Sequence, residues 1–258
     1  MSVLLGNGNG SFKAAQNIAT GGKTAMNVTT ADVNNDGFVD ITVSNFDSDN
    51  VSVLLGNGNG SFKAPQTSTT GKSPWGVVTA DVNGDGHVDI ITADTNSATV
   101  SVLLGNGNGS FKAPQAFGTG GTPNSVAVAD VNLDGKLDIV TTNNSSNSLS
   151  VLLGNGNGTF KGQTFIPVAS AAQAATVSIA DLNADGKPDI VYGDAYDANV
   201  WVLLGNGDGT FEAAQNFVVG TSPELPTSVA LADLNKDGKI DIVTANAIQN
   251  SVSVLLHD

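Results

Sequence analysis

The sequence contains no cysteine, few basic residues and few aromatic side chains. Without cysteine the chain forms neither disulfides nor a cysteine-ligated zinc site, and cysteine usage gives no indication of its redox compartment. Lys and Arg total 10 against 24 Asp and Glu, which gives a net charge of −14. Nucleic acids and anionic membranes are bound through Lys and Arg clusters, so we expect neither as a partner.

Long apolar runs are also missing. No run approaches the roughly 18 residues of a membrane span, so we expect no membrane insertion. The opening stretch MSVLLGNGNG has no basic segment and its apolar run stops at Leu5. It therefore does not have the pattern of a signal peptide.

What the sequence does contain is an internal repeat. The stretch ADVNNDGFVD at 31–40 returns four times with small changes, and its first aspartates lie 49, 49, 51 and 52 residues apart. A second marker, SVLLGNGNGSF, begins at Ser2, Ser52 and Ser101, and returns slightly altered at Ser150 and Trp201. A fixed period of this length is typical of propellers and other repeat architectures. We see no linker or change of composition, and predict a single domain over residues 1–258.

Each repeat has the pattern of four short strands, here called a, b, c and d. In the third repeat SVAVAD (125–130) alternates, LDIVTTN (137–143) and SLSVLL (148–153) are rich in β-branched residues, and TFKGQTF (159–165) follows a Gly-Asn-Gly turn. Four antiparallel strands per repeat predict an all-β fold, a β-propeller most simply built of five blades. The Asn-Gly dipeptides favour a hairpin turn between strands c and d over a phosphate-binding loop, because the GxGxxG spacing is missing.

The number of strands predicts how the ring closes. The chain holds 21 such segments, one more than five blades need. We expect the N- and C-terminal segments to share the closing blade, with the strand after Phe12 completing the last repeat. Ser2–Leu5 and Ser253–Leu256 then compete for one strand c position. We expect a monomer, with strand exchange between chains as the alternative.

The repeated acidic stretch has the spacing of a cation-binding loop. In the first copy, oxygen-bearing side chains stand at positions 1, 3 and 5, glycine at 6 and another aspartate at 9. Calcium takes six to eight oxygen ligands, and glycine permits the sharp turn. Solvated Asx turns are the simpler alternative for a stretch so rich in Asp, Asn and Gly. Fifteen of the 24 acidic residues lie in the five loops, so five divalent ions reduce the net charge from −14 to −4.

The loops resemble those of the integrin-like FG-GAP or VCBS repeats, whose D-x-[DN]-x-D-G-x-x-D loop joins the first two strands of a propeller blade. Val43 at position 12 and the flanking strands distinguish them from an EF-hand. Propellers of that family usually have seven or eight blades, whereas five loops are present here. The resemblance implies about five Ca²⁺ ions, held by side-chain oxygens at positions 1, 3, 5 and 9 and by the carbonyl at position 7. The implied ligands are Asp32, Asn34, Asp36, Phe38 and Asp40; Asp81, Asn83, Asp85, His87 and Asp89; Asp130, Asn132, Asp134, Lys136 and Asp138; Asp181, Asn183, Asp185, Lys187 and Asp189; and Asp233, Asn235, Asp237, Lys239 and Asp241.

Catalytic residues are hard to identify in this sequence, and we expect a protein that is not an enzyme. The only histidines are His87, inside a loop, and His257, near the end, and neither comes with a nucleophile and an orienting acid. We expect a binding or adhesion module at the cell surface or outside the cell, because sites of this kind suit extracellular calcium.

Aromatic residues that differ between repeats are the candidates for ligand contacts. Trp75, Trp201 and Tyr196 could stack on a sugar or anchor a surface protein, although packing between blades is the simpler role for such rings. Three functions remain open. They are a lectin; a protein-adhesion surface or a consensus scaffold without a ligand; and a polysaccharide-processing domain.

Overall fold

The computed structural model describes residues 1–168, 174–194, 198–220, 226–248 and 250–257, and its regular secondary structure is almost entirely β-strand. It contains 21 strands, as the sequence predicts, and one short 3₁₀ helix, η1 (Phe46–Ser48). Within the described ranges no helix is long and apolar enough to cross a membrane.

Four repeats form complete four-stranded antiparallel blades, in which the strands pair in chain order. Blade 1 consists of β3 (Ala25–Ala31), β4 (Asp40–Asn45), β5 (Asn50–Leu54) and β6 (Gln66–Thr69). Blade 2 consists of β7 (Pro74–Ala80), β8 (Asp89–Asp94), β9 (Thr99–Leu103) and β10 (Gln115–Gly118). Blade 3 consists of β11 (Pro123–Ala129), β12 (Asp138–Asn143), β13 (Ser148–Leu152) and β14 (Thr164–Pro167), and blade 4 of β15 (Ala174–Ala180), β16 (Asp189–Asp194), β17 (Asn199–Leu203) and β18 (Gln215–Val218).

The fifth repeat forms only three strands, and here one prediction is wrong. Blade 5 consists of β19 (Pro226–Ala232), β20 (Asp241–Asn246) and β21 (Ser251–Leu255), while β1 (Ser2–Val3) and β2 (Gln16–Asn17) form a separate two-stranded sheet. The N- and C-terminal segments therefore do not share a blade. Both copies of strand c are formed, because β2 pairs with β1 and leaves the edge of β21 unpaired among the described residues.

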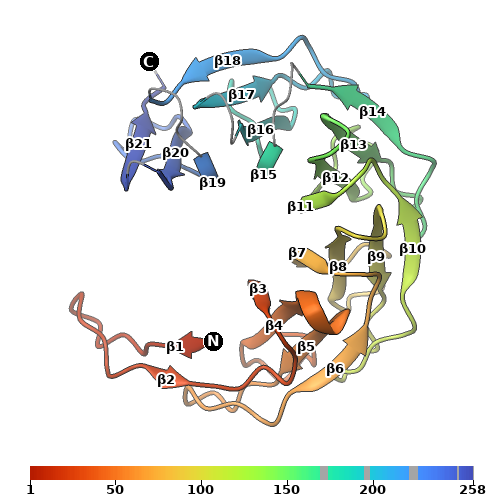
Figure 1. Cartoon of the computed structure of the whole chain (residues 1–258), viewed down its shortest axis with the longest axis vertical. Helices are drawn as coiled ribbons and strands as arrows, with labels where there is room; N and C mark the ends of the chain where they lie inside the picture. The colour runs from red at the N-terminus through yellow and green to blue at the C-terminus, as the bar shows by residue number, and fades with distance from the viewer. Residues whose placement is uncertain (169–173, 195–197, 221–225, 249, 258) are drawn as a thin grey trace.

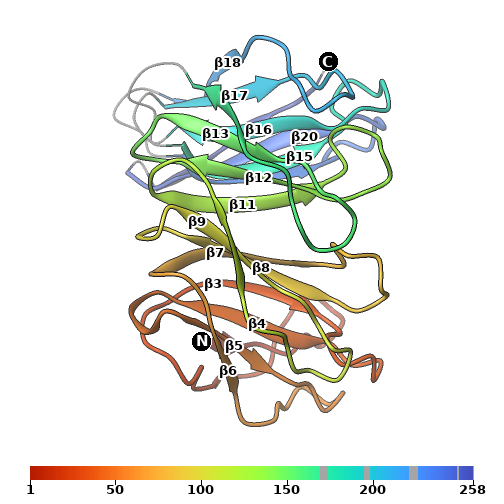
Figure 2. The same ribbon diagram turned by 90° about the vertical axis from the view of Figure 1, so that its right-hand side faces the viewer.

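The blades are arranged along an open arc. The first strands β3, β7, β11, β15 and β19 lie next to one another along its inner side, and the last strands follow its rim (Figure 1). Turned by 90°, the sheets lie one above another (Figure 2). The chain termini lie at opposite ends of the arc (Figure 1). Its blade 5 end exposes 64% of Val252 and 53% of Val254, whereas the equivalent Val200 and Val202 of blade 4 are 0% and 6% exposed.

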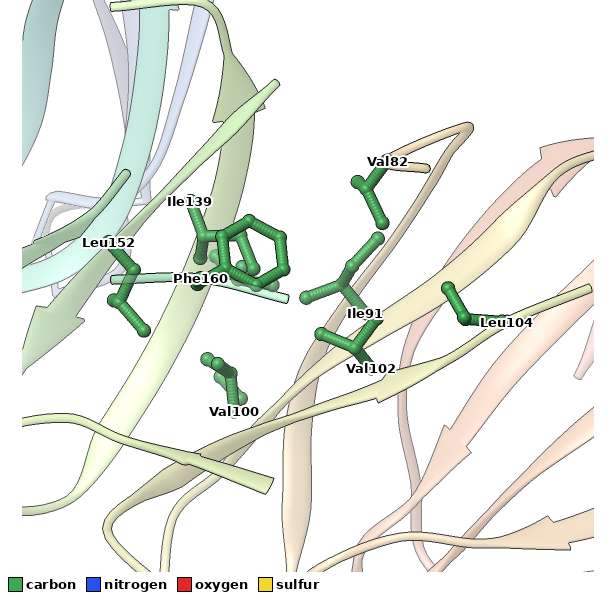
Figure 3. Close-up of a cluster of buried hydrophobic side chains, with 10 residues drawn as sticks. Val82, Ile91, Val100, Val102, Leu104, Ile139, Leu152 and Phe160 are labelled. Atoms are coloured by element: carbon green, nitrogen blue, oxygen red, sulfur yellow. The ribbon is translucent and has the colours of Figure 1, made fainter. Parts of the chain in front are cut away.

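The apolar core lies between neighbouring blades. Strands β4, β8, β12 and β16 are buried along their whole length, which explains their continuous apolar and β-branched composition. Between blades 2 and 3, Phe160 packs with Ile91 and Val102 on one side and with Ile139 and Leu152 on the other (Figure 3). The junction between blades 2 and 3 is thus filled by side chains from both blades, which holds these blades at a fixed angle.

A phenylalanine follows the c–d turn of every complete blade. Phe111 packs in the cluster between blades 1 and 2, and Phe211 in the cluster between blades 3 and 4. Phe62 packs with residues of the N-terminal hairpin against blade 1. Phe12, the copy within that hairpin, is 63% exposed.

A polar residue is buried at the end of the second strand of each blade. In blade 3 it is Asn143, whose amide donates to Ser148 Oγ (3.2 Å) and Ser150 Oγ (2.8 Å). In blade 2 it is Asp94, whose carboxylate accepts from Ser101 Oγ (2.6 Å) and Thr92 Oγ1 (2.7 Å). Burial raises the pKa of Asp94 to about 6, because the charged form loses solvation.

We expect Asp94→Asn to stabilise the protein at neutral pH. The folded pKa lies above the ordinary value of 3.8, so the contribution of Asp94 to stability is lost as the pH rises from about 4 to about 6. At pH 7 the variant should gain about 1–3 kcal/mol of unfolding free energy, measured by urea unfolding without divalent ions. The gap should close below about pH 4.

The arrangement in blade 3 shows that the amide fits. There the backbone N–H of Gly120 donates to Ser150 Oγ (3.1 Å), and in blade 2 the N–H of Gly71 already reaches Ser101 Oγ (3.0 Å). A variant no more stable than the parent at pH 7, or equally shifted at every pH, contradicts the prediction.

Candidate functional site

Each acidic loop forms the turn between the first two strands of a blade. In the loop of blade 1, Asn35 and Gly37 at positions 4 and 6 adopt left-handed backbone conformations, with φ of 57° and 83°. Position 4 is left-handed in all five loops, although only blade 2 has glycine there. The backbone therefore curves around the loop side chains even where a residue other than glycine must adopt the less favourable left-handed conformation.

The first and fifth positions organise the loop through Asx-type hydrogen bonds. Asp32 Oδ2 accepts from the N–H of Gly37 (2.8 Å), and Asp36 Oδ1 accepts from the N–H of Phe38 (2.9 Å). Asn34 Oδ1 accepts from the N–H of Asp36 (3.0 Å). The corresponding bonds recur in the other four loops. The Asx turns of the simpler interpretation are therefore present.

The ninth position has a different environment. Asp138 is fully buried, and its two oxygens accept from the N–H of Val131 (3.0 Å) and the N–H of Gly154 (2.7 Å). The first bond closes the loop, and the second ties it to the c–d turn of the same blade. Gly154 is needed for this approach, because a Cβ there would lie 2.2 Å from the carbonyl oxygen of Leu137.

All five ninth-position aspartates make this pair of bonds. Asp40, Asp89 and Asp189 bond a loop N–H and a glycine N–H, and Asp241 bonds the N–H groups of Leu234 and His257. From the spacing alone, the residue at position 9 is predicted to be a cation ligand like those at positions 1, 3 and 5. The structure shows that this carboxylate also braces the blade.

The electrostatics of the loops differ by position. Burial, with a further contribution from the charges of Asp81 and Asp85, raises the pKa of Asp89 to about 6. Burial likewise raises the pKa of Asp138 and of Asp189. At position 5 the backbone N–H of Lys187 lowers the pKa of Asp185. The negative charges at positions 1 and 5 therefore make the ionised carboxylate at position 9 less favourable. A bound cation would have the opposite effect.

The predicted ligands lie together in each loop, but their side chains do not form a complete metal site in the described residues. Within the described residues, no group of three or more His, Cys, Asp or Glu side chains is placed to hold a metal ion. Two lysines at position 7 instead pair with position 5, Lys136 with Asp134 (3.4 Å) and Lys187 with Asp185 (3.2 Å). The atoms predicted to bind a cation in each loop are all oxygens, which are the ligand atoms that calcium prefers.

The three aromatic candidates have different surroundings. Trp75, at the start of β7, is 38% exposed and packs edge-on against Phe46 of η1, with ring centroids 5.7 Å apart. Trp201 stacks on the buried Tyr192 at 6.3 Å, and its indole N–H donates to Asp194 (3.3 Å), so it packs at the junction of blades 3 and 4. Tyr196 lies outside the described residues. Phe46 could not be singled out from sequence, because its contact with Trp75 joins two different blades.

Comparison with protein families identifies the repeat. A family described as FG-GAP-like repeat matches residues 1–43, 32–92, 81–141, 130–192 and 181–244. A search of curated proteins gave no significant match.

Solved structures of very different proteins share the architecture. A lectin of Agrocybe aegerita that recognises non-reducing terminal N-acetylglucosamine is 24% identical, with 95% of this chain and 68% of the lectin aligned and a TM-score of 0.65. Virginiamycin B lyase of Staphylococcus aureus is 14% identical over 100% of this chain and 74% of the lyase, with a TM-score of 0.67. The Tc holotoxin pore of Photorhabdus luminescens is 15% identical over 98% of this chain and 12% of its own, with a TM-score of 0.52. These likenesses show the propeller-like fold.

Proposed function

Because the chain belongs to the family of FG-GAP-like repeat proteins, we propose that it is a calcium-stabilised binding module that recognises glycans. Its role is binding and not catalysis, and its setting is the cell surface or the extracellular space, where calcium is abundant. The five acidic loops support the calcium part of the proposal, and the exposed Trp75 supports the glycan part.

Calcium would be held by the loops at the start of each second strand. In blade 1 these oxygens belong to Asp32, Asn34, Asp36 and Asp40, together with the carbonyl of Phe38, and the other loops offer equivalent sets. Each carboxylate oxygen that accepts one backbone N–H keeps a further lone pair. The ion would supply positive charge at the point where three carboxylates crowd, so its binding free energy becomes folding free energy.

The glycan site would be built on Trp75. Its ring is presented at the junction of blades 1 and 2, with Phe46 holding one edge. Its carbonyl accepts from Ser44 Oγ (2.6 Å), which ties β7 to the neighbouring blade. A partly exposed indole ring that is held by its contact with Phe46 offers an apolar face on which a sugar can stack. The lectin of Agrocybe aegerita shows that a protein of similar fold recognises a glycan.

We expect Trp75→Ala to abolish glycan binding. A glycan array that includes terminal N-acetylglucosamine should give binding by the parent chain, and the variant should lose affinity about tenfold or more, because a central aromatic anchor carries much of the binding free energy. Phe165→Ala is the matched control, since Phe165 is also exposed, at 51%, but lies on β14. Circular dichroism checks that both variants are folded.

Other outcomes distinguish the remaining functions. Capture of a protein with no glycan bound favours an adhesion surface, and no ligand of either kind favours a scaffold. Turnover of a polysaccharide that is lost on substitution of one Asp or Glu outside the loops establishes an enzyme. Each of these results contradicts the glycan proposal.

A further inference from the structure

The junction between blades 4 and 5 lacks a side chain that the other junctions contain. A cavity of about 430 Å³ lies there, lined by Leu182, Val202, Leu204, Ile242 and Leu255, among others. These residues are the repeat equivalents of Val82, Val102, Leu104, Ile139 and Leu152, which belong with Phe160 to the cluster between blades 2 and 3 (Figure 3). The cavity therefore has the lining of a phenylalanine site, and the described residues after β21, Leu256 and His257, include no phenylalanine.

The same blade also lacks its outer strand. In blade 4, β18 pairs with β17 through four residues, from Asn199 opposite Val218 to Val202 opposite Gln215. The equivalent residues of β21 are Ser251 to Val254, and their outer edge has no partner within the described chain. An unpaired edge of this kind accepts an extended segment readily.

The N-terminal hairpin carries both missing parts. Phe12 is 63% exposed, and Gln16–Ala19 is the repeat equivalent of the strand that completes each blade. In the structure this segment pairs with β1 at two positions, Ser2 with Asn17 and Val3 with Gln16, and Met1 and Ile18 exchange two further backbone hydrogen bonds. Pairing with β21 offers four pairs in the register of the other blades and buries the ring of Phe12.

We propose that the hairpin of a second copy of this chain completes blade 5, and that two copies exchange hairpins reciprocally. Phe12 of one copy enters the cavity, and its residues 16–19 pair with β21 of the other. The chain's own hairpin lies at the opposite end of the arc (Figure 1), and four packed junctions separate the two ends. The hairpin is joined to blade 1 through Gly21 and Gly22, where the chain can change direction, and reciprocal exchange leaves neither copy with an open cavity.

Disulfide trapping tests the proposed register, since the chain has no cysteine of its own. Val254→Cys and Gln16→Cys place thiols directly opposite each other if β2 pairs with β21 as β18 pairs with β17. When the two single variants are mixed with different affinity tags and oxidised, we expect a covalent heterodimer. Gln16→Cys mixed with Val218→Cys, an exposed position on β18, is the collision control and should give none.

The same cysteine at position 16 distinguishes the alternatives. A double variant Gln16→Cys, Val254→Cys that cross-links only within monomers shows that the hairpin of the same chain closes the ring, and this overturns the proposal. If Val3→Cys with Gln16→Cys cross-links quantitatively while the mixed variants do not, the hairpin stays as the structure shows it, and the proposal also fails.

The association itself should depend on Phe12. Light scattering should give a particle of twice the 25.9 kDa chain mass, dissociating on dilution. Phe12→Ala should raise the dissociation constant at least about a hundredfold, because the exchanged dimer buries two phenyl rings. The thermal stability of the monomer should change little, since the ring is exposed there. Lys13→Ala is the neighbouring control, and an unchanged dissociation constant for Phe12→Ala contradicts the proposal.

Discussion

Millimolar calcium should raise the unfolding temperature of this chain, and excess chelator should lower it. A ligand that binds only the folded state and is present at one to ten times its dissociation constant adds about 0.4–1.4 kcal/mol per site. Sites of this kind bind extracellular calcium at roughly 10⁻⁴–10⁻³ M. Five loops acting together should therefore shift the midpoint by about 10 °C or more, measured by differential scanning calorimetry at fixed ionic strength.

Two controls separate a specific site from screening of the net charge of −14. Magnesium at equal ionic strength should stabilise much less, because a smaller ion fits a flexible oxygen loop poorly. Asp134→Asn should remove one loop's share of the calcium response, whereas Asp208→Asn, in a c–d turn outside the loops, should leave it intact. Equal midpoints in calcium and chelator would show that the loops are Asx turns without a metal.

Removing the ninth-position aspartate should destabilise the chain far more than removing the fifth, even without calcium. Asp138→Ala leaves the N–H groups of Val131 and Gly154 without their acceptor in a buried site. Each unsatisfied buried donor costs about 1–3 kcal/mol, so we expect a loss of about 3–5 kcal/mol in urea unfolding. That is a large fraction of the stability of an ordinary domain.

Asp134→Ala is the matched comparison within the same loop. Its side chain is exposed, and its bond to the N–H of Lys136 (3.0 Å) can be replaced by water. In chelator we expect a much smaller loss than for Asp138→Ala, with a further loss only when calcium is added. Equal losses for the two variants in chelator would mean that Asp138 does not brace the c–d turn.

Much of the architecture follows from local patterns in the sequence. The spacing of the loop aspartates, the β-branched runs and the Asn-Gly turns predicted the 21 strands, the single repeat period and the position of each acidic loop. These features depend on residues close together in the chain, and the same local physics acts in every repeat. For that reason four repeats fold into the same four-stranded blade, and the fifth forms the first three of these strands.

Only the tertiary structure shows which residues at the same position of the repeat also have the same surroundings. Trp75 is exposed while Trp201 packs on Tyr192, and Phe160 is buried while Phe12 is not. The ends of the arc are the clearest case, because the sequence predicted a shared closing blade and the structure keeps β2 with β1. Pairing of strands far apart in sequence depends on the curvature accumulated over all blade junctions, and no single repeat encodes that sum.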